Sequence, residues 1–368
     1  MTKLLQGRVV LEAVSPRSSW GVRLAAAFAG RIAADLGAQV VCLQPAGEAA
    51  LPDTNAAIEE ASALHSFLSA GKNVVTGVGG DAASTLAREI AGGANALLGD
   101  DWLRNAAAEA LGQKLAAGAP RAIVQVGMLP RQRGHEPPAS EFTVEAESGL
   151  LDLVGDACRE PVRLAGHQVA YSAGLAAYTG MVAAFCRRGP QPPVVRVSLL
   201  ETALWLNWKN LATVSIGETP ATRSGQAMSW PVVRCADGWV AVVYQPHEWE
   251  TLRDTLGDPR LRDPRFGTPA GRASHASELA ALFEGSLARL TRGEVNALAA
   301  RHRLPLGVVQ SAGELADDPH YRARSFVRSV ASDAGSVSVP RLPVLWSGEL
   351  FAPGRIPARG MQEEETLA

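Results

Sequence analysis

The chain of 368 residues contains few of the residues that mark disulfide-rich, metal-binding or membrane proteins. Its four cysteines lie far apart in the sequence, without a CxxC pair or a histidine spaced for zinc: Cys42, Cys158, Cys186 and Cys235. We therefore expect neither a disulfide framework nor a metal site. No uninterrupted run of about 20 apolar residues is present, so the sequence predicts no contact with a membrane.

The chain also lacks an excess of charge of either sign. Its 35 Lys and Arg residues nearly balance 37 Asp and Glu residues, which argues against nucleic acid or an anionic membrane surface as a partner. The first 14 residues do not have the pattern of a signal peptide. These observations predict a cytoplasmic globular protein with a small-molecule partner, and 47% hydrophobic residues suffice for one large core or two modest ones.

Strand and helix patterns alternate along the first part of the chain. Residues 8–14 are β-branched, 24–36 carry helical spacing, and 39–43 read as a second strand, with Gly37 where a helix C-cap is expected. This order predicts a parallel βαβ unit with a right-handed crossover.

The same alternation continues through strands at 73–78, 94–98 and 122–126, with helices at 82–91 and 102–116 between them. The pattern predicts an α/β fold with a doubly wound, Rossmann-like sheet. Ligands of such sheets bind at the carboxyl ends of the strands. The expected site is therefore lined by the loops that follow Val14, Leu43, Leu98 and Val126.

The second half of the sequence predicts helices at 141–154, 171–187 and 200–216, with a strand at 194–199. After these elements the pattern of the residues changes. Short strands and Ala-rich helices then suggest a smaller α+β domain at 224–330. We expect the segment that follows this smaller domain to pack again with the core of the first domain. We predict a large domain formed by residues 1–223 and 331–368, with the smaller domain inserted.

Three basic residues are candidates for binding an anionic cofactor. Lys72 precedes a strand, where an ammonium could meet a phosphate, and Arg131 and Arg133 lie in a Pro-bounded loop, where they could pair with a diphosphate or a carboxylate. Solvated surface charge explains Arg131 and Arg133 equally well and is the commoner explanation for a lysine such as Lys72. The glycines of 76–81 lack the full spacing of a phosphate-binding loop.

Two further residues are candidates for catalysis. His167 precedes a Gly-containing helix, where it could act as a general acid or base, or simply cap the helix. Glu141 follows Ser140 at the first turn of its helix, where a carboxylate also offsets the helix dipole without any catalytic function. The sequence supports no Ser-His-Asp order and no activated cysteine.

Motifs along nearly the whole chain resemble CoA-transferase family III, the superfamily of formyl-CoA transferase, carnitine CoA-transferase and α-methylacyl-CoA racemase. The resemblance runs from about Val9 to Pro343. It rests on AAAFAGRIAADLGAQVVCLQP, LSAGKNVV, SEFTVEAESGLLDLVG, AYSAGLAAYTGMVAAFCRRG with VVRVSLLETAL, and GDPRLRDPRFGTPAGR, in that order. It implies coenzyme A as a substrate, with an acyl-CoA and a carboxylic acid as partners, no metal, and two interlocked chains forming a dimer.

The resemblance fails at the position of the family nucleophile. The transferases use an Asp four residues before the glycine that is Gly174 here, and this chain has Ala170 there. A methyl group cannot attack a thioester. Gln44 also replaces the usual Glu at the end of the second strand, and the racemase His-Asp element is not matched around Phe142.

Two hypotheses follow from these observations. In the first, the chain transfers CoA between carboxylic acids, with Glu141 or His167 replacing the lost Asp. In the second, it is a catalytically silent homologue that pairs with an active paralogue. A dinucleotide oxidoreductase is disfavoured because no complete GxGxxG is present.

Overall fold

The structure is a computed structural model, and it describes residues 3–15, 17–45, 58–78, 93–111, 120–130, 139–155, 158–187, 189, 191–223, 230–332 and 335–357. The chain divides into two compact units, each described here by itself. Unit 1 comprises Met1–Arg223 and Arg324–Ala368, and unit 2 comprises Ser224–Ala323.

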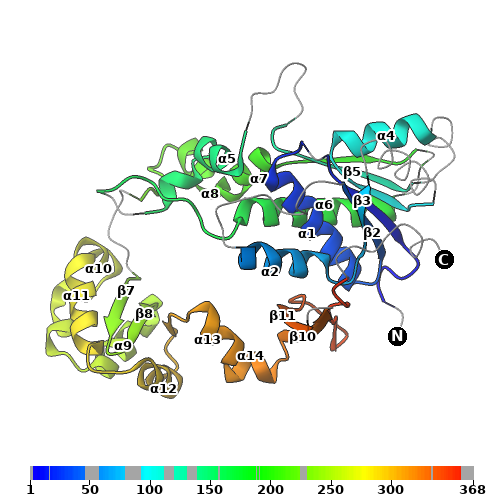
Figure 1. The fold of residues 1–368 in the computed structure, drawn as a ribbon. Helices are drawn as coiled ribbons and strands as arrows, with labels where there is room; N and C mark the ends of the chain where they lie inside the picture. Colours follow the sequence, from blue (N-terminus) through cyan, green and yellow to red (C-terminus); the bar gives the residue numbers. More distant parts are fainter. Residues whose placement is uncertain are drawn as a thin grey trace. The chain divides into compact units, whose positions relative to one another are not determined.

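Unit 1 is built on a six-stranded parallel sheet (Figure 1). Its order is β3 (Asn73–Val78), β2 (Gln39–Pro45), β1 (Val9–Ala13), β4 (Ala96–Gly99), β5 (Ala122–Gly127) and β6 (Val194–Ser198). The direction in which successive strands are added to the sheet reverses between β1 and β4, as in the Rossmann arrangement. The carboxyl ends of these two strands therefore flank the expected ligand crevice.

Helices cover both faces of this sheet because alternate strand residues are apolar on both sides. Val10, Leu98 and Val124 belong to the core that includes the helices α1 (Trp20–Asp35) and α6 (Gln168–Cys186). On the opposite face, Leu11 and Leu97 pack with Leu103 of α4 (Asp101–Leu111). The predicted α/β fold with a parallel central sheet is confirmed.

The helices α1 and α6 pack closely because small residues line their contact. A Cβ atom placed on Gly174 would lie 2.6 Å from the carbonyl oxygen of Ala25. By length and composition alone, the 19 residues of α6 are apolar enough to cross a membrane, although Gln, Ser, Thr and Tyr interrupt the apolar run. In this fold, however, Ala170, Ala173 and Ala177 are fully buried in the core of unit 1. One face of α6 therefore packs in this core, and 39% of its apolar window is buried.

The segment between β5 and β6 contributes α5 (Glu141–Glu147), a 3₁₀ turn (Leu150–Leu153) and then α6. Ser140 and Thr143 form a capping box that fixes the start of α5. The helix predicted at 200–216 is two helices, α7 (Leu199–Leu206) and α8 (Trp208–Ser215). Asn207 interrupts it because its side chain donates a hydrogen bond to the carbonyl oxygen of Ser148 at 2.9 Å.

Unit 1 also contains α2 (Ile58–Ser69) and two antiparallel hairpins near the C-terminus. The hairpins are β10 (Val327–Ser332) with β11 (Gly335–Pro340), and β12 (Leu345–Trp346) with β13 (Glu349–Leu350). Val330 of β10 packs with Ala70 and Ile356 in a small core. Residues 324–330, expected in the smaller domain, therefore lie in unit 1. Whether the two units are independent domains stays a prediction.

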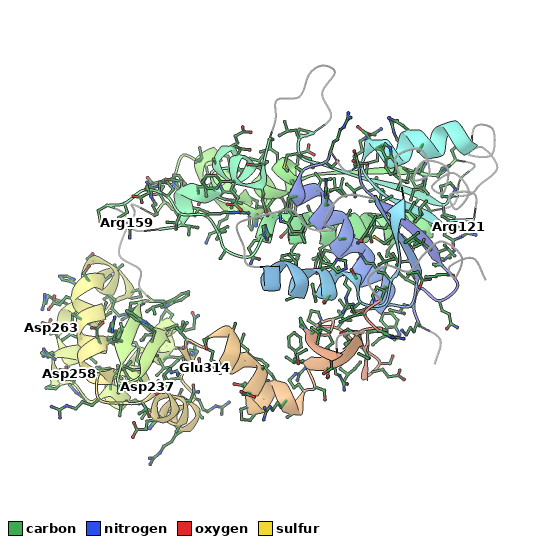
Figure 2. All side chains as sticks on the ribbon, in the orientation of Figure 1. Arg121, Arg159, Asp237, Asp258, Asp263 and Glu314 are labelled. Carbon is green, nitrogen blue, oxygen red and sulfur yellow. The ribbon has the colours of Figure 1, made fainter. Side chains whose placement is uncertain are left out.

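Unit 2 contains a three-stranded antiparallel sheet of β7 (Val232–Cys235), β8 (Gly238–Val242) and β9 (Leu306–Val308). Its helices are α9 (Trp249–Leu256), α10 (Pro269–Ser274), α11 (Ala276–Leu287), α12 (Arg292–His302), α13 (Ala312–Asp317) and α14 (Pro319–Ala323). Trp249, Phe266 and Phe283 form an aromatic centre. Asp258 and Asp263, labelled in Figure 2, each bind the arginine two residues further on.

Candidate active site

The loop between β1 and α1 is fastened at the carboxyl end of the sheet by Asp100. One oxygen of this carboxylate accepts hydrogen bonds from the Ser15 N–H and the Ser18 hydroxyl. The other oxygen accepts from the Trp102 N–H and so starts α4. Because Asp100 directly follows β4, this carboxylate joins the two strands at which the succession reverses and positions the start of α1, where Trp20 lies.

A buried carboxylate, Glu141, contacts the N-terminus of α6. Its Oε1 accepts a hydrogen bond from the backbone N–H of Ala170 at 3.1 Å, and its Oε2 lies 2.7 Å from His167 Nδ1. Arg163 Nη2 donates to the same Oε2 at 2.9 Å. Glu141 is only 4% exposed. The structure therefore brings the two predicted catalytic residues, Glu141 and His167, into direct contact.

His167 is the residue that immediately precedes α6, and its backbone adopts φ 54°, in the left-handed region. Its ring meets Trp20 edge-on, with the ring centroids 5.9 Å apart. Trp20 Nε1 is directed at His167 Nε2 across 3.5 Å, a long distance for a hydrogen bond. The imidazole is thus held on one side by a carboxylate and on the other by an indole.

Opposing effects determine the charge of Glu141. Burial favours the neutral carboxyl, but the hydrogen bonds from His167 and the Ala170 N–H, together with the charge of Arg163, outweigh burial and lower the pKa of Glu141. Burial raises the pKa of neighbouring Glu145, whose Oε1 lies 3.9 Å from Arg163 Nε. Burial and the charge of Glu141 also raise the pKa of Tyr171. Glu141 is consequently ionised at neutral pH.

The position of the family nucleophile lies in the same place but carries no reactive group. Ala170 is fully buried, and its N–H is already bonded to Glu141. The carboxylate beside the first turn of α6 therefore comes from another helix, α5. Among the residues that the structure describes, Glu141 is the only carboxylate bonded to the Ala170 N–H.

Lys72, a predicted cofactor-binding residue, is 4% exposed and lies in the interior of unit 1. Its ammonium donates to Glu12 Oε2 at 2.7 Å and to the carbonyl oxygen of Ala27 at 2.8 Å. The thiol of Cys42 donates to the other oxygen of Glu12, and burial raises the pKa of this thiol well above its usual value. These contacts give Lys72 a structural function, and a role in binding CoA stays a prediction. Arg131 and Arg133 lie outside the described residues.

Neither Arg163 nor Trp20 is predicted as a site residue from the sequence. Arg163 comes 22 residues after Glu141, and Trp20 comes 147 residues before His167, so only the fold brings them together. The one local signal is the spacing of four residues between Arg163 and His167. Among the described residues, no group of three or more His, Cys, Asp or Glu is arranged to hold a metal ion.

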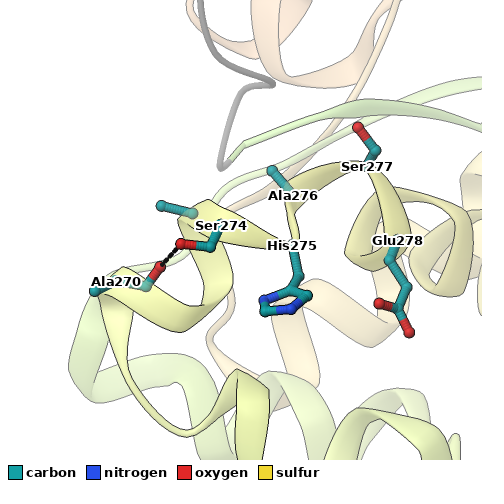
Figure 3. Close-up of a pocket in the computed structure, with 7 residues that line it drawn as sticks. Ala270, Ser274, His275, Ala276, Ser277 and Glu278 are labelled. Carbon is teal, nitrogen blue, oxygen red and sulfur yellow. Dashed lines mark hydrogen bonds between the residues drawn. The ribbon is translucent and has the colours of Figure 1, made fainter.

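A separate hollow of about 720 Å³ lies in unit 2 around the start of α11, and Figure 3 shows its lining. His275 Nδ1 is bonded to the carbonyl oxygen of Gly271 at 2.8 Å, and Glu278 pairs with Arg265. Ser274 donates to the carbonyl oxygen of Ala270. These polar groups are engaged in holding the helices of unit 2, so the group around Glu141 is the stronger candidate site.

A Rossmann-type parallel sheet with a carboxylate and an imidazole paired at the start of α6 defines an α/β protein with a candidate acid–base group. The sequence profile of CoA-transferase family III matches residues 5–363, and the chain belongs to this family. It is 28% identical over 218 residues to formyl-CoA:oxalate CoA-transferase of Streptomyces avermitilis, covering 52% of this chain and 53% of that protein.

A second curated relative is succinyl-CoA–D-citramalate CoA-transferase of Chloroflexus aurantiacus, 28% identical over 225 residues, covering 55% of this chain and 56% of that protein. The chain thus matches about half the length of these relatives. Among solved structures, a CaiB/BaiF family protein from Brucella suis superposes with a TM-score of 0.78 at 20% identity, covering 97% of this chain and 96% of that one. Rv3272 from Mycobacterium tuberculosis gives 0.74, also at 20% identity, covering 97% of each chain. These likenesses confirm the fold.

Proposed function

We propose that this chain handles acyl-CoA thioesters and transfers CoA between carboxylic acids, with Glu141 as the acyl acceptor. The observation that carries the proposal is an ionised carboxylate bonded to the N–H of Ala170, the residue at the family's nucleophile position. Its membership of CoA-transferase family III supports the substrate class. The two curated relatives named above are CoA-transferases by name.

In the proposed reaction, Oε2 of Glu141 attacks the thioester carbonyl, and CoA leaves as a thiolate. The resulting mixed anhydride is attacked at the Glu141 carbonyl by CoA, which releases the first acid and leaves CoA on Glu141 as a thioester. An acceptor carboxylate then reverses these steps and departs as the new acyl-CoA. Arg163 and the start of the α6 dipole offset the negative charge near the reacting carbonyl.

The alternative function is a catalytically silent homologue that binds acyl-CoA or stabilises an active paralogue. Two observations favour it. Ala170 presents only a methyl group, and both oxygens of the buried Glu141 are already hydrogen-bonded. A nucleophile must reach its target within about 3–3.5 Å. Glu141 attains that distance only if it exchanges at least one of these partners for the substrate.

Intact-mass measurement after incubation with an acyl-CoA separates the two functions. A covalent acyl or CoA adduct on the unmodified chain, absent from Glu141→Gln, supports transfer through Glu141. No adduct on the unmodified chain or on Ala170→Asp supports the silent homologue. An adduct on Ala170→Asp alone identifies a binding site that is retained without its nucleophile.

The proposal includes a cytoplasmic dimer of interlocked chains, as the family resemblance implies. Large apolar side chains are exposed along α7 and α8: Trp205, Leu206, Trp208, Leu211 and Val214. Trp205 alone is 76% exposed. A surface of this kind favours association with a second chain. In the silent alternative, the second chain is a catalytically active paralogue.

A further inference from the structure

The pairing of His167 with Glu141 supports a second activity at the same site. We propose that His167 acts as a general base, oriented by Glu141, and activates water to hydrolyse an acyl-CoA thioester. This activity needs no acceptor acid. It rests on the proposed function only for the binding of an acyl-CoA beside the start of α6.

The hydrogen-bond geometry determines which nitrogen of His167 carries the lone pair. An ionised carboxylate can only accept, so the 2.7 Å contact with Glu141 Oε2 requires the proton to be on Nδ1. Arg163 Nη2 lies 3.2 Å from the same nitrogen, but a guanidinium only donates and therefore pairs with the carboxylate. The neutral ring then has its lone pair on Nε2, the tautomer that a general base needs.

The side chain of His167 is partly exposed, and Trp20 faces its second nitrogen. The side chain of His167 is 24% exposed, whereas that of Glu141 is 3% exposed. Nε2 accepts a hydrogen bond from the Trp20 N–H at 3.5 Å, which is longer than the usual 2.7–3.2 Å range, so a water molecule that reacts through Nε2 must displace this long contact. Trp20 keeps the ring edge-on and limits its rotation.

The backbone at position 167 is an independent observation. A histidine at φ 54° is less favourable than glycine or asparagine, which adopt left-handed conformations more readily. Residues held in such conformations are concentrated at functional sites. The histidine places an imidazole at the start of α6, beside the position that lacks the family nucleophile.

The proposed step is balanced without any further reactant. His167 Nε2 takes a proton from water while the water oxygen bonds to the thioester carbonyl carbon. The tetrahedral intermediate then breaks its C–S bond, and the departing CoA thiolate receives the proton from Nε2. The products are a carboxylic acid and free CoA, and Glu141 remains unmodified because it stabilises the transient imidazolium without forming a bond to the acyl group.

The test uses the full-length protein with acetyl-CoA or octanoyl-CoA in the absence of any acceptor acid. Release of CoA thiol above the buffer rate is expected. His167→Asn retains a residue suited to the left-handed backbone but removes the base, and we expect its rate to fall at least ~100-fold. His302→Asn, at an exposed histidine of unit 2, is the matched control and should hydrolyse at the unmodified rate.

Glu141→Gln provides a second variant of nearly the same shape. Its side-chain amide can donate to Nδ1, which moves the ring proton to Nε2, so hydrolysis should fall while the melting temperature shows a folded protein. In water enriched in oxygen-18, with enzyme in excess over acyl-CoA, the label should enter the released acid and not the peptide that contains Glu141. Label in Glu141 would overturn direct attack by water.

The outcomes distinguish this proposal from CoA transfer. His167→Asn should still move CoA to an added carboxylic acid if Glu141 is the acyl acceptor. Unchanged hydrolysis in His167→Asn would overturn the general base. Binding of acyl-CoA in equilibrium dialysis without any thiol release overturns hydrolysis alone, whereas failure to bind either acyl-CoA overturns the proposed function as well.

Discussion

At the scale of single residues, Glu141 shows how one carboxylate can join several elements of a fold. It joins α5 to the first turn of α6 through the Ala170 N–H, and it holds His167 and Arg163 in place. Hydrogen bonds to an ionised group are roughly twice as strong as neutral ones. The start of α6 therefore depends on the charge of a residue from another helix.

This dependence predicts that Glu141→Gln lowers the free energy of unfolding by ~1–3 kcal/mol at pH 7. The folded-state pKa of Glu141 lies below its ordinary value of 4.5. Its contribution is therefore fully present above that value and is lost as the pH falls through the lowered folded-state pKa. Urea denaturation of both proteins at pH 7, 5 and 3.5 should show the difference shrinking with acidity. A difference that grows towards pH 3.5 would contradict the assignment.

Ala170→Asp should have a folded-state pKa shift opposite in direction to that of Glu141. The new carboxyl would be buried beside ionised Glu141, so its folded-state pKa should exceed the ordinary value of about 3.9. Relative to Ala170→Asn, the Asp variant should be equally stable at pH 3 and lose ~2–4 kcal/mol by pH 7 as the unfolded chain ionises. Thermal denaturation across this range measures the change. Equal stability at pH 7 would show that the space beside Ala170 admits water.

At the scale of elements, the sequence predicted what depends on local periodicity. Strands such as Asn73–Val78 and Val194–Ser198 were found within a residue of their expected bounds, because β-branched runs bounded by breakers specify them locally. The break at Asn207 was missed because its cause is a hydrogen bond to Ser148, 59 residues away. Propensity alone favours an unbroken helix there.

The candidate site was predicted only in part for the same reason. Glu141 and His167 were chosen from their places at helix starts, and the fold brings them together. Arg163 and Trp20 carry no local signal. Lys72 was expected to be exposed, as lysines usually are, but the partner that allows its burial, Glu12, lies 60 residues earlier. Long-range partners of this kind cannot be read from spacing.

The crossing of α1 and α6 gives a prediction at this scale. In Gly174→Ala the new methyl group would lie 2.6 Å from the Ala25 carbonyl oxygen and 3.1 Å from Phe28 Cβ, so backbone must shift. We expect a loss of ~1–3 kcal/mol. Gly285→Ala, inside α11, meets no atom closer than 3.9 Å and should gain up to ~1 kcal/mol from helix propensity. Thermal denaturation compares them, and equal losses would argue against close packing of α1 on α6.

At the scale of the whole molecule, the exposed apolar face of α7 and α8 is the main feature that one chain leaves uncovered. It predicts self-association at micromolar concentration, because neighbouring exposed large apolar side chains favour burial against a partner. Replacing Trp205 and Trp208 together by Glu should shift the sedimentation coefficient towards that of a monomer. A stable monomer of the unmodified protein at these concentrations would refute the dimer.

The buried group of Cys42, Glu12 and Lys72 also makes the molecule a reporter of its own unfolding. Cys158 and Cys186 are exposed and should react at once with a thiol reagent, whereas Cys42 is buried in the central sheet and its thiol stays protonated. The rate at which Cys42 is alkylated therefore reports how fast unit 1 opens. Cys235 is half-buried in β7, and its alkylation rate reports the opening of unit 2. Peptide mapping of the two modified cysteines during slow denaturation would reveal which unit opens first.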